Sequence, residues 1–458
     1  MPAFHAVLLG SLLCASNLVR ADNPFVQTRY TADPATLVYQ DRLWAFTSHD
    51  NDDATWFNMT DWRLFSTDDM ANWQDHGSPA GLRTFSWARQ DAWAPGAIER
   101  DGKFFLYVPV TPSSGGGMAI GVAVADDIAG PYTDALGGPL VHNGEFDPTV
   151  FIDDGDDQAY LYWGNPNLWY VKLNRDMISF SGAPVQVELT AGGFGPRRAD
   201  VPAEGRPTAY EEGPWLHKHE GTYYMTYAAN CCDEDIHYAT APSATGPWTH
   251  GGLVMASQGG SFTNHPAVVD YKGRGYFLYH NGALPGGGGF QRSVAVEGFE
   301  YGADGGIPTL TMTADGPAQI KDFDPYGEVE AETMAFSRGV STGTSAEGAV
   351  LFVDKINDGD YVKVGGVAFG EEGARWFAAV VAAGRRKCER PAELQIRLDG
   401  EDGKLVGSCV VPANTGGWES WTTVTCDVEG ATGTHDVFFR FVGSGDGDLF
   451  NFDSWGFA

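Results

Sequence analysis

The chain has 458 residues, more than one compact core usually serves, and this length favours two domains. It carries 29 Lys and Arg against 60 Asp and Glu, a formal net charge of −31 at pH 7. Phosphate backbones and anionic membrane surfaces repel so acidic a chain, so we expect neither nucleic acid nor a membrane as a partner. With 13% aromatic residues and 60 Gly, the composition is typical of an all-β protein with many turns that binds a polar, ring-shaped ligand such as a sugar.

The first segment has the features of an export signal. Residues 6–16 are apolar but too short to span a bilayer, and Val19-Arg20-Ala21 ends in a small residue, as cleavage sites do. The sequence therefore predicts a signal peptide over residues 1–21 and a secreted, extracellular protein. Only His5 precedes the apolar run, where basic residues are usual, and a buried N-terminal strand is the alternative.

A repeated hairpin occupies the next three hundred residues. In each copy a strand-like run meets a polar turn and then an aromatic-rich strand, and a further pair of strands follows. The copies begin 53 to 65 residues apart, at Leu37, Ala97, Val150, Trp215 and Val268. Five units of about four strands predict a five-bladed β-propeller over residues 22–318. A large β-sandwich or a β-helix is the alternative.

Acidic residues precede the first strand of several repeats. First strands of propeller blades line the central channel, so the residues before them converge near the axis: Asp33, Ala94, Asp147, Glu212 and His265. Converging carboxylates repel one another and lose hydration, which favours a functional role, although cation ligands closing the axis are the alternative. Hydrolysis of a glycosidic bond uses an acid on the leaving oxygen and a second carboxylate on the other face, and a third can keep the acid protonated.

Short motifs in a fixed order carry a family resemblance. They are Asp-Pro at Asp33, Trp-Ala-Pro-Gly at Trp93, Phe-Asp-Pro-Thr at Phe146, Glu-Gly-Pro at Glu212, Thr-Asn-His-Pro at Thr263 and Arg-Ser-Val at Arg292. On five repeats, this order resembles glycoside hydrolase family 43. The resemblance implies a five-bladed propeller that hydrolyses glycosides with inversion and needs no organic cofactor.

The resemblance also implies roles for single residues. Asp33 is the expected general base, Asp147 the carboxylate that tunes and positions the acid, and Glu212 the general acid. The neighbouring Glu211 lies one residue off the motif and is expected to point the other way from its strand.

Further pocket residues follow from the same resemblance; the alternatives are a core histidine for His265, capping of a loop for Arg292 and packing within a blade for Trp93. His265 matches an axial histidine that contacts a hydrated calcium ion in many members. Arg292 is expected to contact the sugar and the catalytic carboxylates, and Trp93 to offer an apolar face. His49 and Trp163, at the ends of inner strands, are weaker pocket candidates.

After a predicted linker over residues 319–326, a different β pattern covers residues 327–458. Its motifs (Val-Glu-Ala-Glu at Val329, Asn-Asp-Gly-Asp at Asn357, Gly-Gly-Trp at Gly416 and Leu-Phe-Asn-Phe-Asp at Leu449) resemble carbohydrate-binding module family 6. The resemblance implies a β-sandwich (jelly-roll) with a structural calcium ion on Glu330, Glu332 and Asp453, and sugar contacts from Trp418 and Asn451. Ordinary edge-strand charges and plain packing of Trp418 are the alternatives. Lys355 replaces an aromatic residue usual in that family, which leaves sugar binding by this domain open.

Six cysteines are present, and Cys14 belongs to the predicted signal peptide. Cys409 and Cys426 lie in two strand-like runs on either side of a Gly-Gly turn, a spacing suited to a bridge between neighbouring strands. The adjacent Cys231 and Cys232 bond to each other or pair elsewhere, which leaves Cys388 over; spacing alone does not fix the connectivity. Asn58-Met59-Thr60 is a sequon for N-glycosylation if exposed.

These observations predict a monomeric hydrolase of plant cell-wall hemicellulose. The leading prediction is an inverting α-L-arabinofuranosidase acting on arabinoxylan, with arabinoxylan or xylan-derived oligosaccharides as partners. A β-xylosidase, or an enzyme with both activities, is the alternative within the family, and endo-arabinanase is third. A non-catalytic sugar-binding propeller is the alternative from another class. The preference between arabinose and xylose and the linkage cleaved depend on loop shape, which these motifs do not give.

Overall fold

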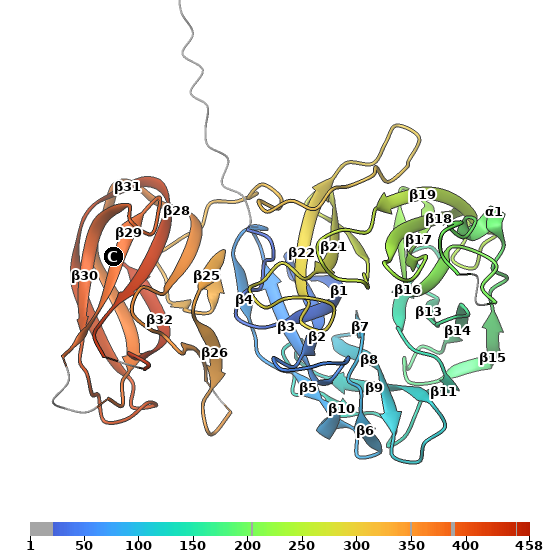
Figure 1. The fold of residues 1–458 in the computed structure, drawn as a ribbon, viewed down its shortest axis with the longest axis horizontal. Coiled ribbons are helices and arrows are strands. Elements are labelled where there is room, and N and C mark those ends of the chain that lie inside the picture. The colour runs from blue at the N-terminus through green and yellow to red at the C-terminus, as the bar shows by residue number, and fades with distance from the viewer. Residues whose placement is uncertain (1–21, 203–204, 349, 386–389, 446) are drawn as a thin grey trace, which may run out of the picture.

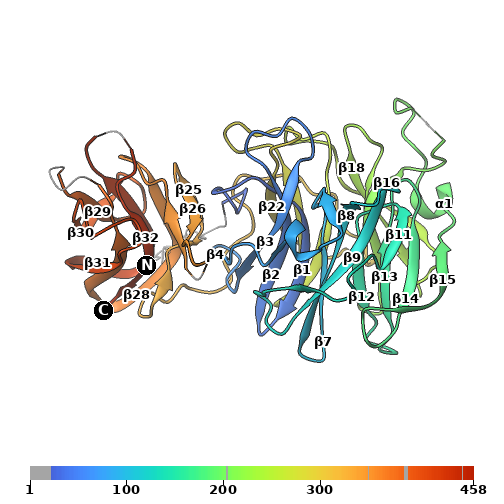
Figure 2. The ribbon, with the colours of Figure 1, turned by 90° about the horizontal axis from the view of Figure 1, so that it is seen from below.

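A computed structural model describes residues 22–458 except 203–204, 349, 386–389 and 446. The predicted signal peptide, with Cys14, and the unassigned Cys388 lie outside the described residues. The described chain forms a five-bladed β-propeller and a C-terminal β-sandwich that lie side by side (Figures 1 and 2). Both parts of the predicted all-β architecture are confirmed.

Blades I and II each contain six strands, counted over the described residues. Blade I has β1 (Thr31–Tyr39), β2 (Arg42–Asp50), β3 (Met59–Thr67), β4 (Trp73–Asp75), β5 (Ala80–Gly81) and β24 (Thr333–Met334). A short 3₁₀ turn, η1 (Leu82–Thr84), leads to blade II. Blade II has β6 (Ala88–Gln90), β7 (Gly96–Arg100), β8 (Lys103–Pro112), β9 (Met118–Ala125), β10 (Thr133–Asp134) and β11 (Val141–Gly144).

Blades III to V are smaller sheets of consecutive antiparallel strands. Blade III has β12 (Thr149–Ile152), β13 (Ala159–Trp163), β14 (Trp169–Leu173) and β15 (Phe180–Gln186), and the helical turn α1 (Ala191–Phe194) follows it. Blade IV has β16 (Tyr210–His219), β17 (Thr222–Ala229), β18 (Asp235–Ala241) and β19 (Thr249–Met255). Blade V has β20 (Ala267–Tyr271), β21 (Arg274–Asn281) and β22 (Ser293–Phe299). The hairpins seen in the sequence are the first two strands of blades I, III, IV and V, and β7 with β8 in blade II.

The innermost strands form a ring. β1 packs against β7, β7 against β12, β12 against β16, β16 against β20, and β20 against β1. The N-terminal segment closes this ring along blade V, because Phe25 N–H donates to Val294 O at 3.1 Å and Thr31 N–H to Arg292 O at 2.9 Å. Aromatic side chains of the repeated hairpins, among them Tyr107, Tyr162 and Tyr279, fill the space between blades and are fully buried.

The C-terminal sandwich is one nine-stranded sheet folded around its own core. Its long strands β28 (Tyr361–Ala382) and β31 (Thr422–Val442) pair along most of their length, and several bulges interrupt their register, which lets the sheet bend into two layers. The other strands are β23 (Val329–Glu330), β25 (Phe336–Arg338), β26 (Ser341–Thr344), β27 (Leu351–Asp354), β29 (Ala392–Leu398), β30 (Lys404–Val411) and β32 (Asn451–Phe457). A disulfide joins Cys409 on β30 to Cys426 on β31, as the spacing predicts.

Paired strands connect the two domains. β24 follows β23 in the chain but pairs with β4 of blade I, with Thr333 opposite Gln74 and Met334 opposite Trp73. Nearby, the Asn72 side chain exchanges two hydrogen bonds with the main chain of Gly365, at 2.7 and 2.9 Å. The sandwich is therefore attached to the outer edge of blade I. Within the described part of the chain, no helix has the length and apolar character needed to cross a bilayer.

Candidate active site

A cavity of about 340 Å³ opens at the axis of the propeller. Asp33, Asp147 and Glu212 all line it, so the structure brings the three predicted carboxyl groups together. Predicted Trp93, His265 and Arg292 line it as well. Further lining residues, not singled out in the sequence, are Trp56, Phe57, Met59, Phe146, Asn165, Cys231, Cys232, Glu234, Phe262 and Thr263.

Unusual backbone conformations present these carboxyl groups to the cavity. Asp33 and Asp147 have positive φ angles of 53° and 60°, and the pairing of β1 with β2 shifts register beside Asp33. Gly213, directly after Glu212, has φ of 58°, and a Cβ atom there would lie 3.1 Å from His265 Nδ1. The Asp-Pro and Glu-Gly-Pro motifs thus mark irregular turns at the inner ends of blades, where a regular strand would direct these side chains elsewhere.

Arg292 holds Asp33 ionised. Its guanidinium donates to Asp33 Oδ1 at 2.9 Å and to both carboxylate oxygens of Asp50 at 2.8 and 2.9 Å, and all three side chains are buried. Ser48 Oγ donates to Asp33 Oδ2 at 2.6 Å. Burial alone would raise the pKa of Asp33, but the Arg292 charge, with His280, lowers that pKa well below its ordinary range. Asp33 is therefore a carboxylate at any working pH, as a general base must be.

The surroundings of Glu212 shift its pKa in the opposite direction to that of Asp33. Burial, with a further contribution from the charge on Asp33, raises the pKa of Glu212 to about 7. Asn165 donates its amide N–H to Glu212 Oε2, which favours the ionised form and limits this rise. Glu212 therefore carries its proton up to about neutral pH, as a general acid requires.

A chain of polar contacts holds Asn165 against Glu212. Arg206 donates to Asn165 Oδ1 at 3.0 Å and pairs with Glu211 Oε1 at 3.0 Å. Arg197 pairs with the other oxygen of Glu211 at 2.8 Å. Glu211 is thus buried between two arginines and is absent from the cavity lining, in agreement with its predicted orientation.

Two further buried carboxyl groups complete the cluster. Asp147 accepts a hydrogen bond from Gly213 N–H at 3.1 Å, and burial together with the charge on Glu212 raises its pKa well above the ordinary value. Glu234 accepts from Asn264 N–H at 2.8 Å through Oε2, while Oε1 is buried without a partner among the described residues. Burial and the charge on Glu212 also raise the pKa of Glu234 well above its ordinary range. The pocket therefore holds one clamped carboxylate beside three carboxyl groups that retain protons readily.

Aromatic rings form the rim of the cavity. Trp93 Nε1–H donates to Phe57 O at 3.0 Å, and its ring meets Phe57 and Phe146 edge to face at centroid distances of 6.0 and 5.2 Å. Trp56, with 63% of its surface exposed, lies at the mouth. Such rings present apolar faces suited to the C–H face of a sugar, and the buried carboxyl groups suit its hydroxyl edge.

Comparison with known proteins places this site in a family. The sequence model for glycosyl hydrolases family 43 matches residues 21–307, and that for the family 6 carbohydrate-binding module matches residues 330–458. The chain belongs to glycosyl hydrolase family 43. It is a glycosidase with an attached carbohydrate-binding module, as the motifs predict.

Relatives resemble this family 43 protein over different lengths. An arabinoxylan arabinofuranohydrolase of Bacillus subtilis (strain 168) is 35% identical over 95% of this chain and 92% of its own. A crystal structure of such an enzyme from Bacillus subtilis, in complex with cellotetraose, superimposes with a TM-score of 0.81 at 34% identity, covering 95% of this chain and 97% of the other. Xylosidase/arabinosidase 43A of Humicola insolens is 32% identical over 62% of this chain and 98% of its own.

Two predicted pocket residues of this family 43 protein lie outside the cavity. Trp163 is fully buried between blades II and III, and its Nε1–H donates to Asn143 Oδ1 at 3.2 Å. His49 pairs with Asp61 on the neighbouring strand at 2.8 Å. Neither is among the residues that line the cavity, so their predicted contact with the sugar stays a prediction. An aromatic residue at a strand end gives the same sequence pattern whether it packs between blades or faces the axis.

His265 lies at the predicted axial position. Its Nδ1 is 3.9 Å from Asp33 Oδ1, and burial lowers the pKa of its imidazole to about 4, so the ring is neutral near pH 7. A neutral imidazole can accept a hydrogen bond from ion-bound water, which is compatible with a hydrated cation at the axis.

The C-terminal residues predicted to bind calcium are Glu330 on the first strand of the sandwich, Glu332 in the turn that follows it, and Asp453 on the last strand. Glu332 is buried, and its Oε2 has no hydrogen-bond partner among the described residues. Burial, with the nearby charge of Glu330, raises the pKa of Glu332 to about 9. Burial and the charge on Asp453 also raise the pKa of Glu330. A buried oxygen without a partner beside two more carboxyl groups fits a hard cation such as Ca²⁺.

Side-chain atoms of the kinds that bind metals lie closer together in the propeller than at the predicted calcium site of the sandwich. Within the described ranges, three ligand atoms of His, Cys, Asp or Glu lie within 4.8 Å of one another only at Cys231, Cys232 and Glu234. The two sulfur atoms there form a disulfide, so no thiolate is present to bind a metal. In the sandwich, the side chains of Glu330, Glu332 and Asp453 would have to move closer together to bind one calcium ion.

The predicted sugar contacts of the sandwich lie next to each other. The Asn451 side-chain amide donates to Trp418 O at 2.7 Å, and the Trp418 side chain is partly exposed, with 39% of the residue accessible. Lys355, at the position where the related family has an aromatic residue, is exposed. Trp418 therefore presents one partly exposed aromatic side chain here, while Asn451 is buried beneath it and donates to its main chain.

Proposed function

We propose that this protein is an inverting α-L-arabinofuranosidase that releases arabinose from arabinoxylan. The observation that carries the proposal is the division of roles in one cavity: Arg292 keeps Asp33 ionised, while burial keeps Glu212 protonated up to about pH 7. An acid and a base with separated pKa values are what single-displacement hydrolysis of a glycoside needs. Similarity to an arabinoxylan arabinofuranohydrolase over 95% of this chain supports the substrate.

In the proposed reaction, Glu212 gives its proton to the oxygen that leaves with the xylan chain. Asp33 takes a proton from a water molecule, which attacks the anomeric carbon from the opposite face. Asp147 accepts the N–H of Gly213, the residue next to Glu212, so it can position the acid, as the family resemblance implies. The ionised Arg292 and the Ser48 hydroxyl group donate to Asp33 and fix it in place.

The test is hydrolysis of wheat arabinoxylan with separate quantification of arabinose and xylose. We expect arabinose as the main product and, by NMR, inversion at the first-formed anomer. Glu212→Gln should lower kcat by about 10²- to 10⁴-fold on substrates with poor leaving groups and less on 4-nitrophenyl glycosides, whose leaving group needs little protonation. An unchanged kcat on arabinoxylan would remove Glu212 from the acid role.

β-Xylosidase activity is the second candidate, because the xylosidase/arabinosidase of Humicola insolens is similar across the propeller. Arabinofuranose and xylopyranose present similar hydroxyl groups, so one pocket can accept both. Xylose as the main product from xylo-oligosaccharides, with little arabinose from arabinoxylan, would favour this candidate.

We also propose that the protein is secreted after removal of residues 1–21, that it acts as a monomer, and that Glu330, Glu332 and Asp453 hold a structural calcium ion. The apolar segment over residues 6–16 supports secretion, and N-terminal sequencing of protein from the culture medium tests it.

The proposed calcium ion would neutralise three carboxylates and join the two ends of the sandwich, since Ala331 N–H already donates to Asp453 O at 2.8 Å. Trp418 and Asn451 would bind xylan.

A further inference from the structure

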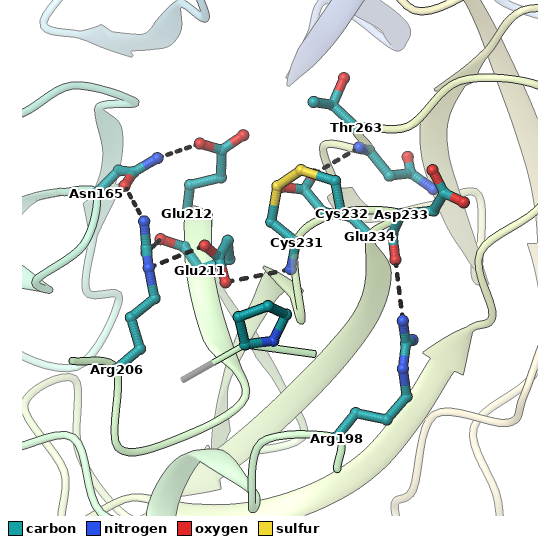
Figure 3. The surroundings of a disulfide bond; sticks show 12 residues. Asn165, Arg198, Arg206, Glu211, Glu212, Cys231, Cys232, Asp233, Glu234 and Thr263 are labelled. Carbon is teal, nitrogen blue, oxygen red and sulfur yellow. Dashed lines mark hydrogen bonds and ion pairs between the residues drawn. A yellow bond between two sulfur atoms is a disulfide. The ribbon is translucent and has the colours of Figure 1, made fainter. Parts of the chain in front are cut away.

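The turn between β17 and β18 places a disulfide in the wall of the catalytic cavity. Cys231 and Cys232, adjacent in the chain, are bonded to each other, and both line the cavity with Glu212 and Glu234 (Figure 3). In this view the disulfide and the Glu212 carboxyl group both lie above the ends of the strands. The only other disulfide among the described residues, Cys409–Cys426, lies in the sandwich.

This pair gives the wall a distinct chemistry. A disulfide has no N–H or O–H group, and its two sulfur atoms with their Cβ atoms form a compact, polarisable, apolar surface. The carboxyl groups and Arg292 that also line the cavity suit hydroxyl groups, and the aromatic rings supply its other apolar surface. A pentose ring carries both kinds of surface, hydroxyl groups at its edge and C–H groups on its faces. The disulfide therefore complements the C–H face.

Hydrogen bonds hold the turn at both ends. Cys231 N–H donates to Glu211 Oε2 at 3.2 Å, and Glu211 is fixed by Arg197 and Arg206. On the other side, Glu234 N–H donates to Phe262 O at 3.1 Å. Through Glu211, Arg206 and Asn165 the same contacts reach Glu212 (Figure 3). The disulfide is consequently held at a fixed place relative to the acid.

We propose that the Cys231–Cys232 disulfide is a substrate contact that determines specificity, because it packs against the C–H face of the pentosyl unit in the cavity. This inference rests on the proposed function, since it requires a pentosyl unit there. Reduction by a dithiol breaks the S–S bond and forms two S–H groups, while the reductant loses two hydrogens and becomes a disulfide. The two thiols are then free to rotate apart, and the continuous apolar surface is lost.

The experiment compares the two disulfides of the full chain. Steady-state kcat and KM on 4-nitrophenyl α-L-arabinofuranoside and β-D-xyloside are measured for wild type, Cys231→Ala/Cys232→Ala and the matched control Cys409→Ala/Cys426→Ala. Each protein is assayed before and after dithiothreitol, with thiol titration to follow reduction. We expect reduction to raise KM about tenfold in wild type and in the control, with a smaller change in kcat, as for loss of one apolar contact in a pocket. Cys231→Ala/Cys232→Ala should show the raised KM from the start and no response to dithiothreitol.

A wild-type KM in Cys231→Ala/Cys232→Ala, or an equal response of that variant to dithiothreitol, would overturn the inference. So would a loss of kcat with unchanged KM, because that would indicate a purely structural role near Glu212. If Cys231→Ala/Cys232→Ala does not fold, reduction and reoxidation of Cys409→Ala/Cys426→Ala give the same comparison reversibly. A KM that does not rise on reduction and fall again on reoxidation would contradict the inference. Failure of the proposed function is distinguishable, because oxidised wild type would then release no product from either glycoside or from arabinoxylan.

Discussion

Two buried acidic residues, Asp33 at the propeller axis and Glu332 in the sandwich, have pKa values that depart from the ordinary value in opposite directions. Asp33 and Glu332 are almost equally buried, with 5% and 4% of their surface exposed. The pKa of Asp33 is lowered below its ordinary range, whereas that of Glu332 is raised to about 9. The difference is the nearest cation: Arg292 contacts Asp33, and no cationic side chain of the described residues is among the causes that set the pKa of Glu332.

The comparison shows that the position of one arginine decides which of several similar carboxyl groups is ionised. Within the propeller, Arg292 contacts Asp33 and Asp50 but not Glu212, so one carboxyl group becomes the base while the other keeps its proton. In the sandwich, the absent charge would have to come from a bound ion. Burial raises the pKa of each of these carboxyl groups, and only a cationic partner reverses the net shift.

Removal of Arg292 should break this comparison with the largest effect. In Arg292→Met, Asp33 and Asp50 become buried carboxylates without a cation, which costs about 3–5 kcal/mol in the free energy of unfolding. Because the pKa of Asp33 would then rise, the acid limb of the pH profile of kcat/KM should move to higher pH, and kcat should fall. Urea denaturation and pH-dependent kinetics measure the two effects.

Asp33→Asn is the matched control for Arg292→Met. It also removes the base and abolishes most activity, but it leaves Arg292 paired with Asp50, so its stability should stay much closer to that of wild type. If Arg292→Met unfolds at the same urea concentration as Asp33→Asn, the cation is not what stabilises the ionised Asp33.

Calcium should make the sandwich cluster resemble the propeller cluster. We expect added Ca²⁺ to raise the Tm of the intact protein by several degrees and EDTA to reverse the rise. Binding must displace the proton of Glu332, whose pKa is about 9, so the Ca²⁺ affinity should increase from pH 6 to pH 9.

Glu332→Gln keeps the shape of the side chain but cannot ionise. Its Tm without calcium should equal or exceed that of ion-free wild type, and Ca²⁺ should no longer raise it. Glu328→Gln, on an exposed neighbouring side chain outside the predicted ligand set, is the control and should keep the calcium response. A calcium response retained in Glu332→Gln would exclude this residue as a ligand.

The smallest expected effect concerns the pKa of the general acid Glu212 when its contact with Asn165 is removed. The Asn165 amide favours the ionised form of Glu212, so Asn165→Ala should raise the pKa of Glu212 above about 7. Since the reaction needs protonated Glu212, activity is retained below that pKa and lost above it, and the alkaline limb of kcat/KM should shift upward, by less than about one pH unit. Gln186→Ala, which removes a neighbouring contact with Asn167 only, should leave the limb in place. A downward shift in Asn165→Ala would contradict the assigned direction.

The sequence was sufficient for the parts of the fold that repeat. Five hairpins of similar spacing predicted the blades, and the residues before their first strands predicted that Asp33, Asp147 and Glu212 would meet at the axis. Arg292 followed from a family motif. Asn165, Glu234 and Asp50 were missed, because they lie in connections or at a strand end that differ from blade to blade.

The two predicted pocket residues outside the cavity lining have a related physical explanation. Trp163 ends an aromatic-rich inner strand in the same way as a pocket residue would, but its indole packs between two blades. Whether a side chain at that place faces the axis or the neighbouring blade depends on the twist of the sheet and on the register with the next blade. Neither is encoded in a local run of residues.

The pairing of β24 with β4 affects how the two domains meet a polysaccharide. A flexible linker lets a binding module search a volume and raises the local substrate concentration by an amount that depends on linker length. Here two residues of the sandwich segment are hydrogen-bonded into blade I, so the module sits at a set distance and angle from the catalytic cavity. If the module binds xylan as proposed, the gain would be confined to chains long enough to reach both sites at once. The joint between the domains would then make the benefit of the module depend on substrate length.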